Sequence, residues 1–198
     1  MTESYVEITR ADRERVPALA TVLARTFADD PMIRWPFHDH HVVERAEPMF
    51  TALLNEYAAL DIVLEADNGV GVASWVPPGS EMGLEKVNVA TRHAIAGLTD
   101  DGGDRYHRFW GWLESSLPTE PHWFLDMVGV EPSRQGEGIG GALVRHGIDL
   151  AQSDGVPAFL ETGKARNVPY YERFGFRIAR EDDAPGGGPH IWFMRLDP

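Results

Sequence analysis

The chain has 198 residues, 43% hydrophobic and 25% charged, so it is long enough for one buried core, and its composition argues against disordered, collagen-like and coiled-coil proteins. With 31 acidic against 18 basic residues, its net charge of −13 disfavours nucleic acid and anionic lipid as partners, and suits either a cationic small molecule or plain solubility. The absence of cysteine excludes disulfides, thiolate metal sites and a covalent thioester on the enzyme.

The beginning of the chain carries no recognisable targeting signal. MTESYVEITRADRERV has neither the basic segment nor the apolar run of a signal peptide. No later run approaches the ~20 apolar residues of a membrane span. We therefore expect a cytoplasmic protein that binds neither membranes nor nucleic acid.

The first elements along the chain are a strand and two helices. Residues 5–8 alternate like a strand, and Thr9 or Asp12 could cap the helix that follows, whose apolar residues recur every three to four positions. The dipeptide Asp30-Pro31 would end this helix. A second apolar helical pattern follows the irregular link MIRWPFHDHH.

A hairpin and two further helices complete the first half of the chain. LDIVLEADNGVGVASWVPPG predicts the hairpin, because β-rich runs flank Asn68-Gly69 as the turn centre. Helical spacing returns over residues 84–98 and 106–117. Between them TDDGGD, residues 99–104, is rich in turn residues and could form a lid.

The second half alternates strands with helices. We expect strands at 123–130, 157–162, 176–180 and 190–196, and helices at 138–153 and 168–174. Strands before, between and after the helices predict an α/β fold with a mixed sheet covered by helices.

The stretch SRQGEGIGGALV, residues 133–144, fits two phosphate-binding patterns. It contains the G-x-G-x-x-G of a dinucleotide-binding turn and also Q-x-x-G-x-G, and in both the glycines let backbone N–H groups of a helix start approach an anion. A dinucleotide turn should follow its strand directly, whereas EPSRQ intervenes, and too little sequence follows for a doubly wound sheet. A glycine turn needed only for backbone geometry is the third alternative.

The surroundings favour the second pattern. VGVEPSRQGEGIGGALV resembles the acyl-CoA-binding motif of the GCN5-related N-acetyltransferase (GNAT) family, and NVPYYERFGFR resembles that family's second signature. HWFLDMVGV, GVPAFLETGKARNVPYYERFGF and IWFMR look most like puromycin N-acetyltransferase and its relatives.

The resemblance also implies a structure. The GNAT fold has a central, twisted, mostly antiparallel sheet of about six to seven strands with helices on both faces, here in one domain over residues 1–198. Residues 1–118 would build the acceptor half and residues 119–198 the acetyl-CoA half. A homodimer is possible, because members of the family often dimerise.

The same resemblance implies that acetyl-CoA is the co-substrate and that no metal takes part. Tyr171 would protonate the departing thiolate, or else would be half-buried packing. Asn167 would contact the pantetheine arm, or else would only cap a helix. The expected cofactor-binding residues are Val128, Gly129 and Val130 at the thioester carbonyl, Gln135, Gly136, Glu137, Gly138, Ile139, Gly140 and Gly141 at the pyrophosphate, and Asn167 and Tyr170 along the arm.

Glu161 is our candidate for the general base. It ends a predicted strand beside the one that holds the thioester, where partial burial would raise its pKa toward neutrality. Water could instead take the proton and leave Glu161 to orient the ammonium. Asp30 and Asp126 could contact a cationic acceptor, with capping or surface roles as the alternative. Aromatic residues, Trp35 and Trp75 among them, could line the acceptor site, and core packing is the alternative for each.

Three other features bear on the chemistry. HDHH lacks the helical H-E-x-x-H spacing and reads as a solvated loop, and the absence of G-x-S-x-G argues against a serine nucleophile. Glu137 departs from the family pattern by placing a carboxylate beside the expected pyrophosphate, so we expect its side chain to point to solvent. The basic residues expected to offset it, some of which could reach the adenosine 3′-phosphate, are Arg134, Arg145, Lys164 and Arg166.

The sequence therefore predicts direct transfer of acetyl from acetyl-CoA to a primary amine of a small molecule. Puromycin-like aminonucleosides come first, with antibiotic inactivation or metabolism as the role. Acetylation of a protein or peptide is the alternative within this class. A sensor that binds acyl-CoA without turnover is the alternative from another class, against which Tyr171 and Glu161 argue.

Overall fold

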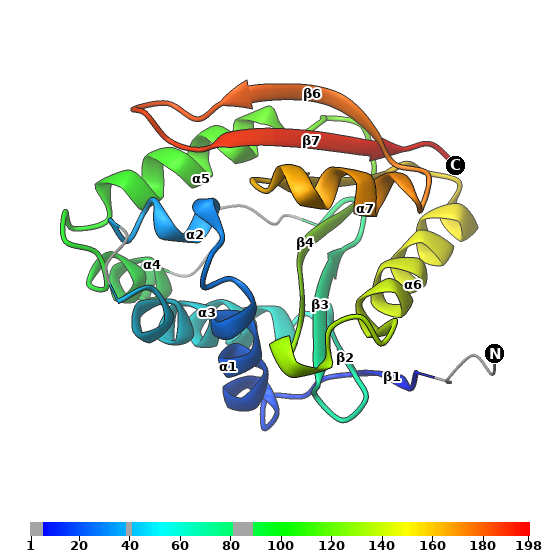
Figure 1. Ribbon diagram of the computed structural model, residues 1–198, viewed down its shortest axis with the longest axis horizontal. Coiled ribbons are helices and arrows are strands. Elements are labelled where there is room, and N and C mark those ends of the chain that lie inside the picture. Colours follow the sequence, from blue (N-terminus) through cyan, green and yellow to red (C-terminus); the bar gives the residue numbers. More distant parts are fainter. Residues whose placement is uncertain (1–5, 39–40, 81–88) are drawn as a thin grey trace.

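Seven strands form one sheet in the computed structural model, which describes residues 6–38, 41–80 and 89–198 (Figure 1). Their order is β1-β2-β3-β4-β5-β7-β6, and β4 and β5 are the only parallel neighbours among these strands. The mixed, mostly antiparallel sheet that the sequence predicts is confirmed. The strands are β1 (Ile8–Arg10), β2 (Val63–Ala66), β3 (Gly71–Val76), β4 (Trp123–Val130), β5 (Ala158–Thr162), β6 (Arg177–Asp183) and β7 (His190–Leu196).

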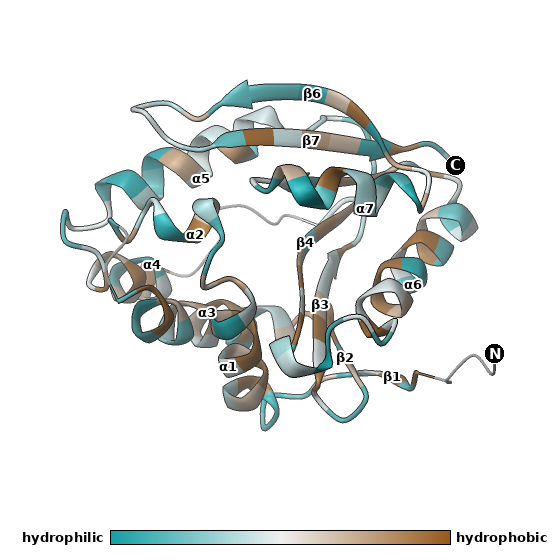
Figure 2. Ribbon diagram, viewed as in Figure 1, coloured by the Kyte–Doolittle hydropathy of each residue, from teal (hydrophilic) through white to brown (hydrophobic). Residues whose placement is uncertain are grey.

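Helices cover both faces of the sheet. One hydrophobic cluster joins α1 and α3 to one face, a second joins α6 and α7 to the other, and a third ties α2 and α5 to β7. Apolar positions of α1 and α6 turn toward the strands in Figure 2. The helices are α1 (Val16–Thr26), α2 (Pro31–Arg34), α3 (Val42–Ala58), α4 (Val89–Ala96), α5 (Asp104–Ser116), α6 (Ile139–Asp154) and α7 (Val168–Glu172).

The sheet opens between β4 and β5. The two strands pair only from Trp123 with Ala158 to Leu125 with Leu160. Beyond this point β4 continues on β3 alone, and β5 continues on β7 alone. Asp126 also lies at a bulge, because the register with β3 passes from Leu125 directly to Met127. The strands therefore part at Asp126 and Glu161.

Local details at the first strand and the first helix differ from the sequence prediction. The first strand lies at Ile8–Arg10 instead of residues 5–8, of which residue 5 is outside the described part. Neither Thr9 nor Asp12 caps α1: the helix begins after Arg15, and the Asp12 carboxylate accepts a bond from the Glu14 N–H.

The hairpin is centred on Asn68-Gly69, as the sequence predicts, because Ala66 pairs with Gly71 across the loop. Asp67 and Asn68 have φ of 52° and 63°, and the Gly69 N–H donates to the Ala66 carbonyl at 3.2 Å. Two central residues with positive φ and this bond make a type I′ turn on Asp67-Asn68.

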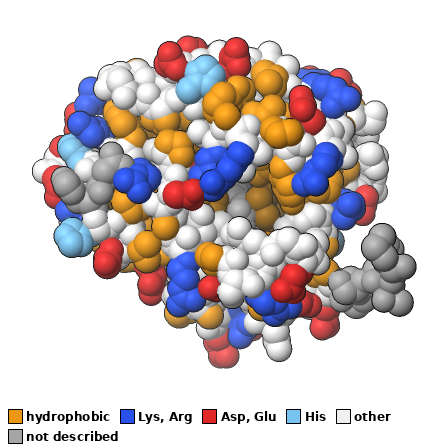
Figure 3. All heavy atoms as spheres, in the orientation of Figure 1, with side chains coloured by type: hydrophobic (Ala, Val, Ile, Leu, Met, Phe, Trp, Pro, Cys, Tyr) orange, Lys and Arg blue, Asp and Glu red, His pale blue; other side chains and the backbone are white. Residues whose placement is uncertain are grey.

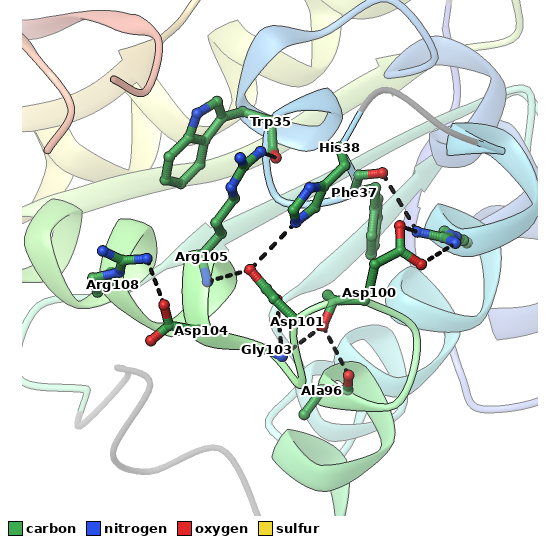
Figure 4. Close-up of polar contacts among 12 residues, drawn as sticks. Trp35, Phe37, His38, Ala96, Asp100, Asp101, Gly103, Asp104, Arg105 and Arg108 are labelled. Carbon is green, nitrogen blue, oxygen red and sulfur yellow. Dashed lines mark hydrogen bonds and ion pairs between the residues drawn. The ribbon is translucent and has the colours of Figure 1, made fainter. Parts of the chain in front are cut away.

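The segment 99–104 is bonded to the elements beside it (Figure 4). Arg45 of α3 forms an ion pair with Asp100, with 2.7 Å between Nη2 and Oδ1. Asp101 lies 3.3 Å from His38 Nε2 and also accepts a bond from the Arg105 N–H. Of the helix expected at 84–98, residues 89–96 form α4, and 84–88 lie outside the described residues.

Candidate active site

A cleft of about 1310 Å³ occupies the place where β4 and β5 part. Residues from α1, α3, β4, α5, α6 and α7 line it. Figure 3 shows a hollow on this face, with apolar side chains inside and Lys and Arg side chains at its rim. The described lining includes nothing from 99–104, so the position of that segment gives no support to the predicted lid.

The glycine-rich turn forms an anion cradle at one end of the cleft. Gly136 and Gly138 have φ of 86° and 89°, a conformation that glycine adopts without strain. The first bond within α6 runs from the Ala142 N–H to the Gly138 carbonyl, so the preceding amides of Ile139, Gly140 and Gly141 have no helical carbonyl as partner. A 16-residue helix adds its favourable dipole.

The cradle also has room for a ligand. A Cβ built on Gly136 or Gly138 would meet no atom within 4 Å, so the space above these residues is open. The residues present therefore fit a pyrophosphate. The dinucleotide alternative does not fit, because β4 has a single parallel neighbour and a 3₁₀ turn at Pro132–Arg134 separates it from the glycines.

Neighbouring side chains neutralise or stabilise this turn. Glu137 is exposed and pairs with Arg134, with 2.8 Å between Nε and each carboxylate oxygen, and this ion pair lowers the pKa of Glu137. The expectation that Glu137 faces solvent with a basic partner is confirmed. Gln135 donates through Nε2 to the Val130 carbonyl at 3.1 Å, so its side chain holds the turn. Lys164 and Arg166 instead both pair with Asp29 at 2.6 Å.

Two half-buried carboxyl groups, Asp126 of β4 and Glu161 of β5, line the cleft where the strands part. Burial raises the pKa of Asp126 to about 6, and the Tyr57 hydroxyl partly offsets this effect. Burial and then the charge of Asp126 raise the pKa of Glu161 well above its ordinary value. Glu161 Oε2 is buried and has no hydrogen-bond partner. Ionising both groups at once is therefore unfavourable, and the site is suited to receive a cation or a proton.

Tyrosines surround this pair of acids. Tyr171 lines the cleft, is 7% exposed, and has its pKa raised by burial, with Asp30 and Glu161 contributing. Its hydroxyl is thus protonated at neutral pH and can act as a donor. Tyr57 and Tyr106 also line the cleft, and burial followed by the charge of Asp126 raises the pKa of both.

Tyr57 and Tyr106 could not be recognised as cleft residues from their place in the sequence. They sit on the apolar faces of α3 and α5, where they read as packing. One feature of the sequence could have identified them: a tyrosine on a buried helix face needs a polar partner for its hydroxyl group, which indicates a polar group nearby.

Asp30 and Asn167, which we expected at the site, line the cleft and also make polar contacts within the protein. Asp30 is 4% exposed, accepts a bond from the Met32 N–H at 2.9 Å and lies 3.5 Å from Lys164 Nζ, so it caps α2. Asn167 makes no side-chain cap bond; its Nδ2 donates to Thr162 Oγ1 at 3.0 Å. Asn167 therefore occupies the N-cap position of α7, and its side chain does not cap the helix.

Trp35 and Trp75 do not line the cleft, and the prediction that they form its wall is wrong. Trp75 points to the α6 face of β3, is 1% exposed, and donates through Nε1 to the Leu143 carbonyl at 3.1 Å. Trp35 packs on Phe109. The aromatic side chains that do line the cleft on the side of α1 and α3 are Phe27, Phe50, Tyr57, Tyr106, Trp110 and Phe124.

The HDHH segment is described only at its two ends, where His38 is half-buried and His41 is exposed. His38 pairs with Asp101, His41 precedes α3, and His40 lies outside the described residues. Across the described ranges, no group of three His, Asp or Glu side chains is arranged to hold a metal ion. Within the same part of the chain, no helix combines the length and the apolar character needed to span a membrane.

The comparisons with known proteins agree with one another. The model of the acetyltransferase (GNAT) family matches residues 28–176, which include the glycine turn and the cleft acids. An uncharacterized N-acetyltransferase of Schizosaccharomyces pombe is 25% identical over an alignment of 181 residues, which covers 84% of this chain and 72% of the relative.

Solved structures resemble the chain over nearly its whole length. The histone acetyltransferase HPA2 and related acetyltransferase of Corynebacterium glutamicum has 25% identity and a TM-score of 0.70, with 98% of this chain and 97% of the other covered. The polyamine N-acetyltransferase of Drosophila melanogaster has 12% identity and a TM-score of 0.69 over 98% and 100% of the two chains. Arylalkylamine N-acetyltransferase 2 of Aedes aegypti has 12% identity and a TM-score of 0.66 over 98% and 99%. The last two show the fold alone.

Proposed function

The chain belongs to the acetyltransferase (GNAT) family and is an acetyl-CoA-dependent N-acetyltransferase, and we propose that its acceptor is a primary amine on a small molecule with an apolar or aromatic body. The observation that carries this proposal is the composition of the cleft floor. Asp126 and Glu161 lie half-buried where the strands part, below a wall of aromatic and aliphatic side chains.

The charge and shape of the floor favour an ammonium group. An unpartnered carboxylate oxygen in a half-buried site is stabilised by a cation that can donate hydrogen bonds to it. The net charge of −13 raises the local concentration of cations near the protein. Apolar side chains of the cleft increase the affinity for an acceptor whose amine is attached to a hydrophobic body, because that body is buried against them.

The same residues can carry the proton transfers of the reaction. One carboxylate, Glu161 in our assignment, takes a proton from the ammonium directly or through water. The neutral nitrogen then attacks the thioester carbonyl. The oxyanion that forms is stabilised by backbone N–H groups of β4 between Val128 and Val130, along the edge of β4 that β5 leaves unpaired. The C–N bond forms, the C–S bond breaks, and the Tyr171 hydroxyl gives its proton to the departing thiolate. The nitrogen loses its second proton as the amide forms, and water carries a proton back to Tyr171.

Assays with a panel of amines reduce the number of candidate acceptors. The proteins that share this fold include enzymes described as polyamine and arylalkylamine N-acetyltransferases, and the sequence motifs resemble puromycin N-acetyltransferase. A panel of phenethylamine, spermidine, puromycin and a lysine-containing peptide therefore spans the candidates. The puromycin arm also tests a role in antibiotic inactivation, and the peptide arm tests protein acetylation.

The decisive experiment is release of free thiol from acetyl-CoA with each amine, followed by identification of the acetylated product. We expect the highest kcat/KM with an amine that joins one positive charge to an aromatic or aliphatic body. Tyr171→Phe should lower kcat by about 100-fold and leave the dissociation constant of CoA unchanged. Thiol release with the peptide alone would refute the small-molecule acceptor. Binding of acetyl-CoA without turnover on any amine would favour the sensor.

A further inference from the structure

Lysine is rare in this chain, and one of its two lysines lines the cleft. The sequence contains 16 arginines but only the two lysines Lys86 and Lys164. Lys86 lies outside the described residues, and Lys164, in the loop between β5 and α7, lines the cleft. A guanidinium group stays protonated, whereas a lysine amine can lose a proton and become a nucleophile. The chain therefore carries a primary amine of its own inside the cleft of an enzyme that acetylates amines.

The loop that carries Lys164 is packed closely against α2. A Cβ built on Gly163 would lie 2.8 Å from Met32 Cγ, so the backbone there has no room for a side chain. The backbone N–H of Lys164 also donates to Thr162 Oγ1 at 3.3 Å. Only 11% of the Lys164 side chain is exposed to solvent. The amine is thus kept at the cleft and does not extend into solvent as the ammonium of a surface lysine does.

Two aspartates before α2 contact the Lys164 amine, and their surroundings differ. Nζ lies 2.6 Å from Oδ1 of Asp29, which is exposed, and 3.5 Å from Oδ2 of Asp30, which is buried. Burial raises the pKa of Asp30, and the charge of Lys164 partly offsets this effect. In a buried pair, a neutral amine and a neutral carboxyl lose less solvation than the two ions do. Asp30 can therefore take a proton from Lys164 and leave the nitrogen with a free lone pair.

Asp30 also connects Lys164 to the reacting groups. The pKa of Tyr171, which we assign to the departing thiolate, is raised by burial and by neighbouring groups that include Asp30. Asp30, Lys164 and Tyr171 all line the same cleft. An amine, a proton acceptor and a proton donor are thus gathered in the cleft that holds the thioester in the proposed reaction.

We propose that Lys164 is a self-acetylation site, to which the enzyme transfers the acetyl group of its own bound acetyl-CoA. The proposal rests on the proposed function only for acetyl-CoA as the donor and for the role of Tyr171. Lys164 passes one proton to Asp30, which releases it to water, and the neutral nitrogen attacks the thioester carbonyl. The C–N bond forms, the C–S bond breaks, and Tyr171 protonates the thiolate. The second proton of the nitrogen returns to Tyr171 through water, so the products are Nζ-acetyl-lysine and free coenzyme A.

Peptide mass spectrometry of the whole chain after incubation with acetyl-CoA measures acetylation at both lysines. We expect Lys164 to be acetylated at least about tenfold faster than Lys86, because its amine is held in the cleft. The rate per molecule should be independent of protein concentration, and excess coenzyme A should lower it by competing for the cleft. Tyr171→Phe should slow self-acetylation by about the same factor as acetylation of an added amine.

Two matched variants test the proton acceptor. Asp30→Asn keeps a side-chain oxygen for the Met32 N–H at the start of α2, and it should slow acetylation of Lys164 by about tenfold or more. Asp29→Asn removes the same charge from the exposed partner and should not slow it. Equal slowing in the two variants would refute the role of Asp30.

Three results would overturn the self-acetylation site. The first is acetylation of Lys164 and Lys86 at equal rates, and the second is a rate at Lys164 that excess coenzyme A leaves unchanged, because both indicate chemical acetylation from solution. The third is an unmodified Lys164 in a preparation that acetylates an amine of the panel, which would leave the proposed function intact. Transfer to no amine and to neither lysine would overturn the proposed function as well.

Discussion

Replacing Asp126 with Asn should stabilise the protein in a pH-dependent way. The folded-state pKa of Asp126 is about 6 against an ordinary value of 3.8, because burial disfavours its charge. Below pH 4 the carboxyl is protonated in both states and makes no difference. Between pH 4 and 6 only the unfolded chain loses the proton, so the wild-type protein loses stability as the pH rises. Above pH 6 the full penalty remains, which two pKa units put at about 3 kcal/mol.

Solvation of Asp126 in the cleft and its bond from Tyr57 reduce the penalty for its ionisation. We therefore expect the free energy of unfolding of Asp126→Asn to exceed that of the wild type by about 1–3 kcal/mol at pH 7. The advantage should vanish near pH 4. The Asn side chain can still accept a bond from Tyr57, and relief of Glu161 acts in the same direction. Urea unfolding at pH 4, 5, 6 and 7 measures the difference directly.

The control is Asp149→Asn, an exposed position on α6, whose difference from the wild type should be flat with pH. Acetylation of the best amine should fall in Asp126→Asn while its stability rises. A variant that is less stable than the wild type at pH 7, or a gain that is constant from pH 4 to 7, would refute the reasoning. Asp126 would then be an anchor of the fold that is ionised in the folded state.

Two further changes test the packing and the cradle. Gly147→Ala would place a Cβ 1.9 Å from the Trp75 ring, so it should lower the free energy of unfolding by at least ~1 kcal/mol in urea despite the better helix propensity. Gly111→Ala, which meets no atom within 4 Å, should raise it by about 0.5–1 kcal/mol, and equal shifts in the two variants would contradict the contact. Glu137→Lys removes the partner of Arg134 and should tighten acetyl-CoA binding several-fold at low salt, with the gain fading at high salt. Calorimetry that shows the same affinity as the wild type at both salt concentrations would rule this out.

The order of helices and strands could be predicted because it depends on local patterns. The apolar stripes of α1 and α6 recur at helical spacing, and the glycine turn lies between a strand and a helix in the sequence as in the structure. The glycine turn, Asp126, Glu161 and Tyr171, which we selected from the sequence, therefore line one cleft. Each is defined by its distance along the chain from a motif.

The sequence could not show which side chains of the central strands point into the cleft. All six residues of β3 are buried, so its two faces carry no contrast in polarity, and Trp75 could have pointed either way. The parting of β4 from β5 depends on a bulge at Asp126 and on pairing with strands far away in the sequence. Tyr57 gains its polar neighbour only through that arrangement.

The break in the sheet also explains how one cleft can accept two ligands of opposite charge. The amides at the start of α6 that lack a helical carbonyl partner lie on one side of β4, together with Arg145 and Arg173. The half-buried acids Asp126 and Glu161 lie toward the side of α1 and α3. An anionic ligand is attracted to the first region and repelled by the second, and an ammonium group experiences the reverse. Because both regions meet at the point where β4 loses β5, the proposed reaction would bring the thioester and the amine together there, and neither ligand would compete for the other's site.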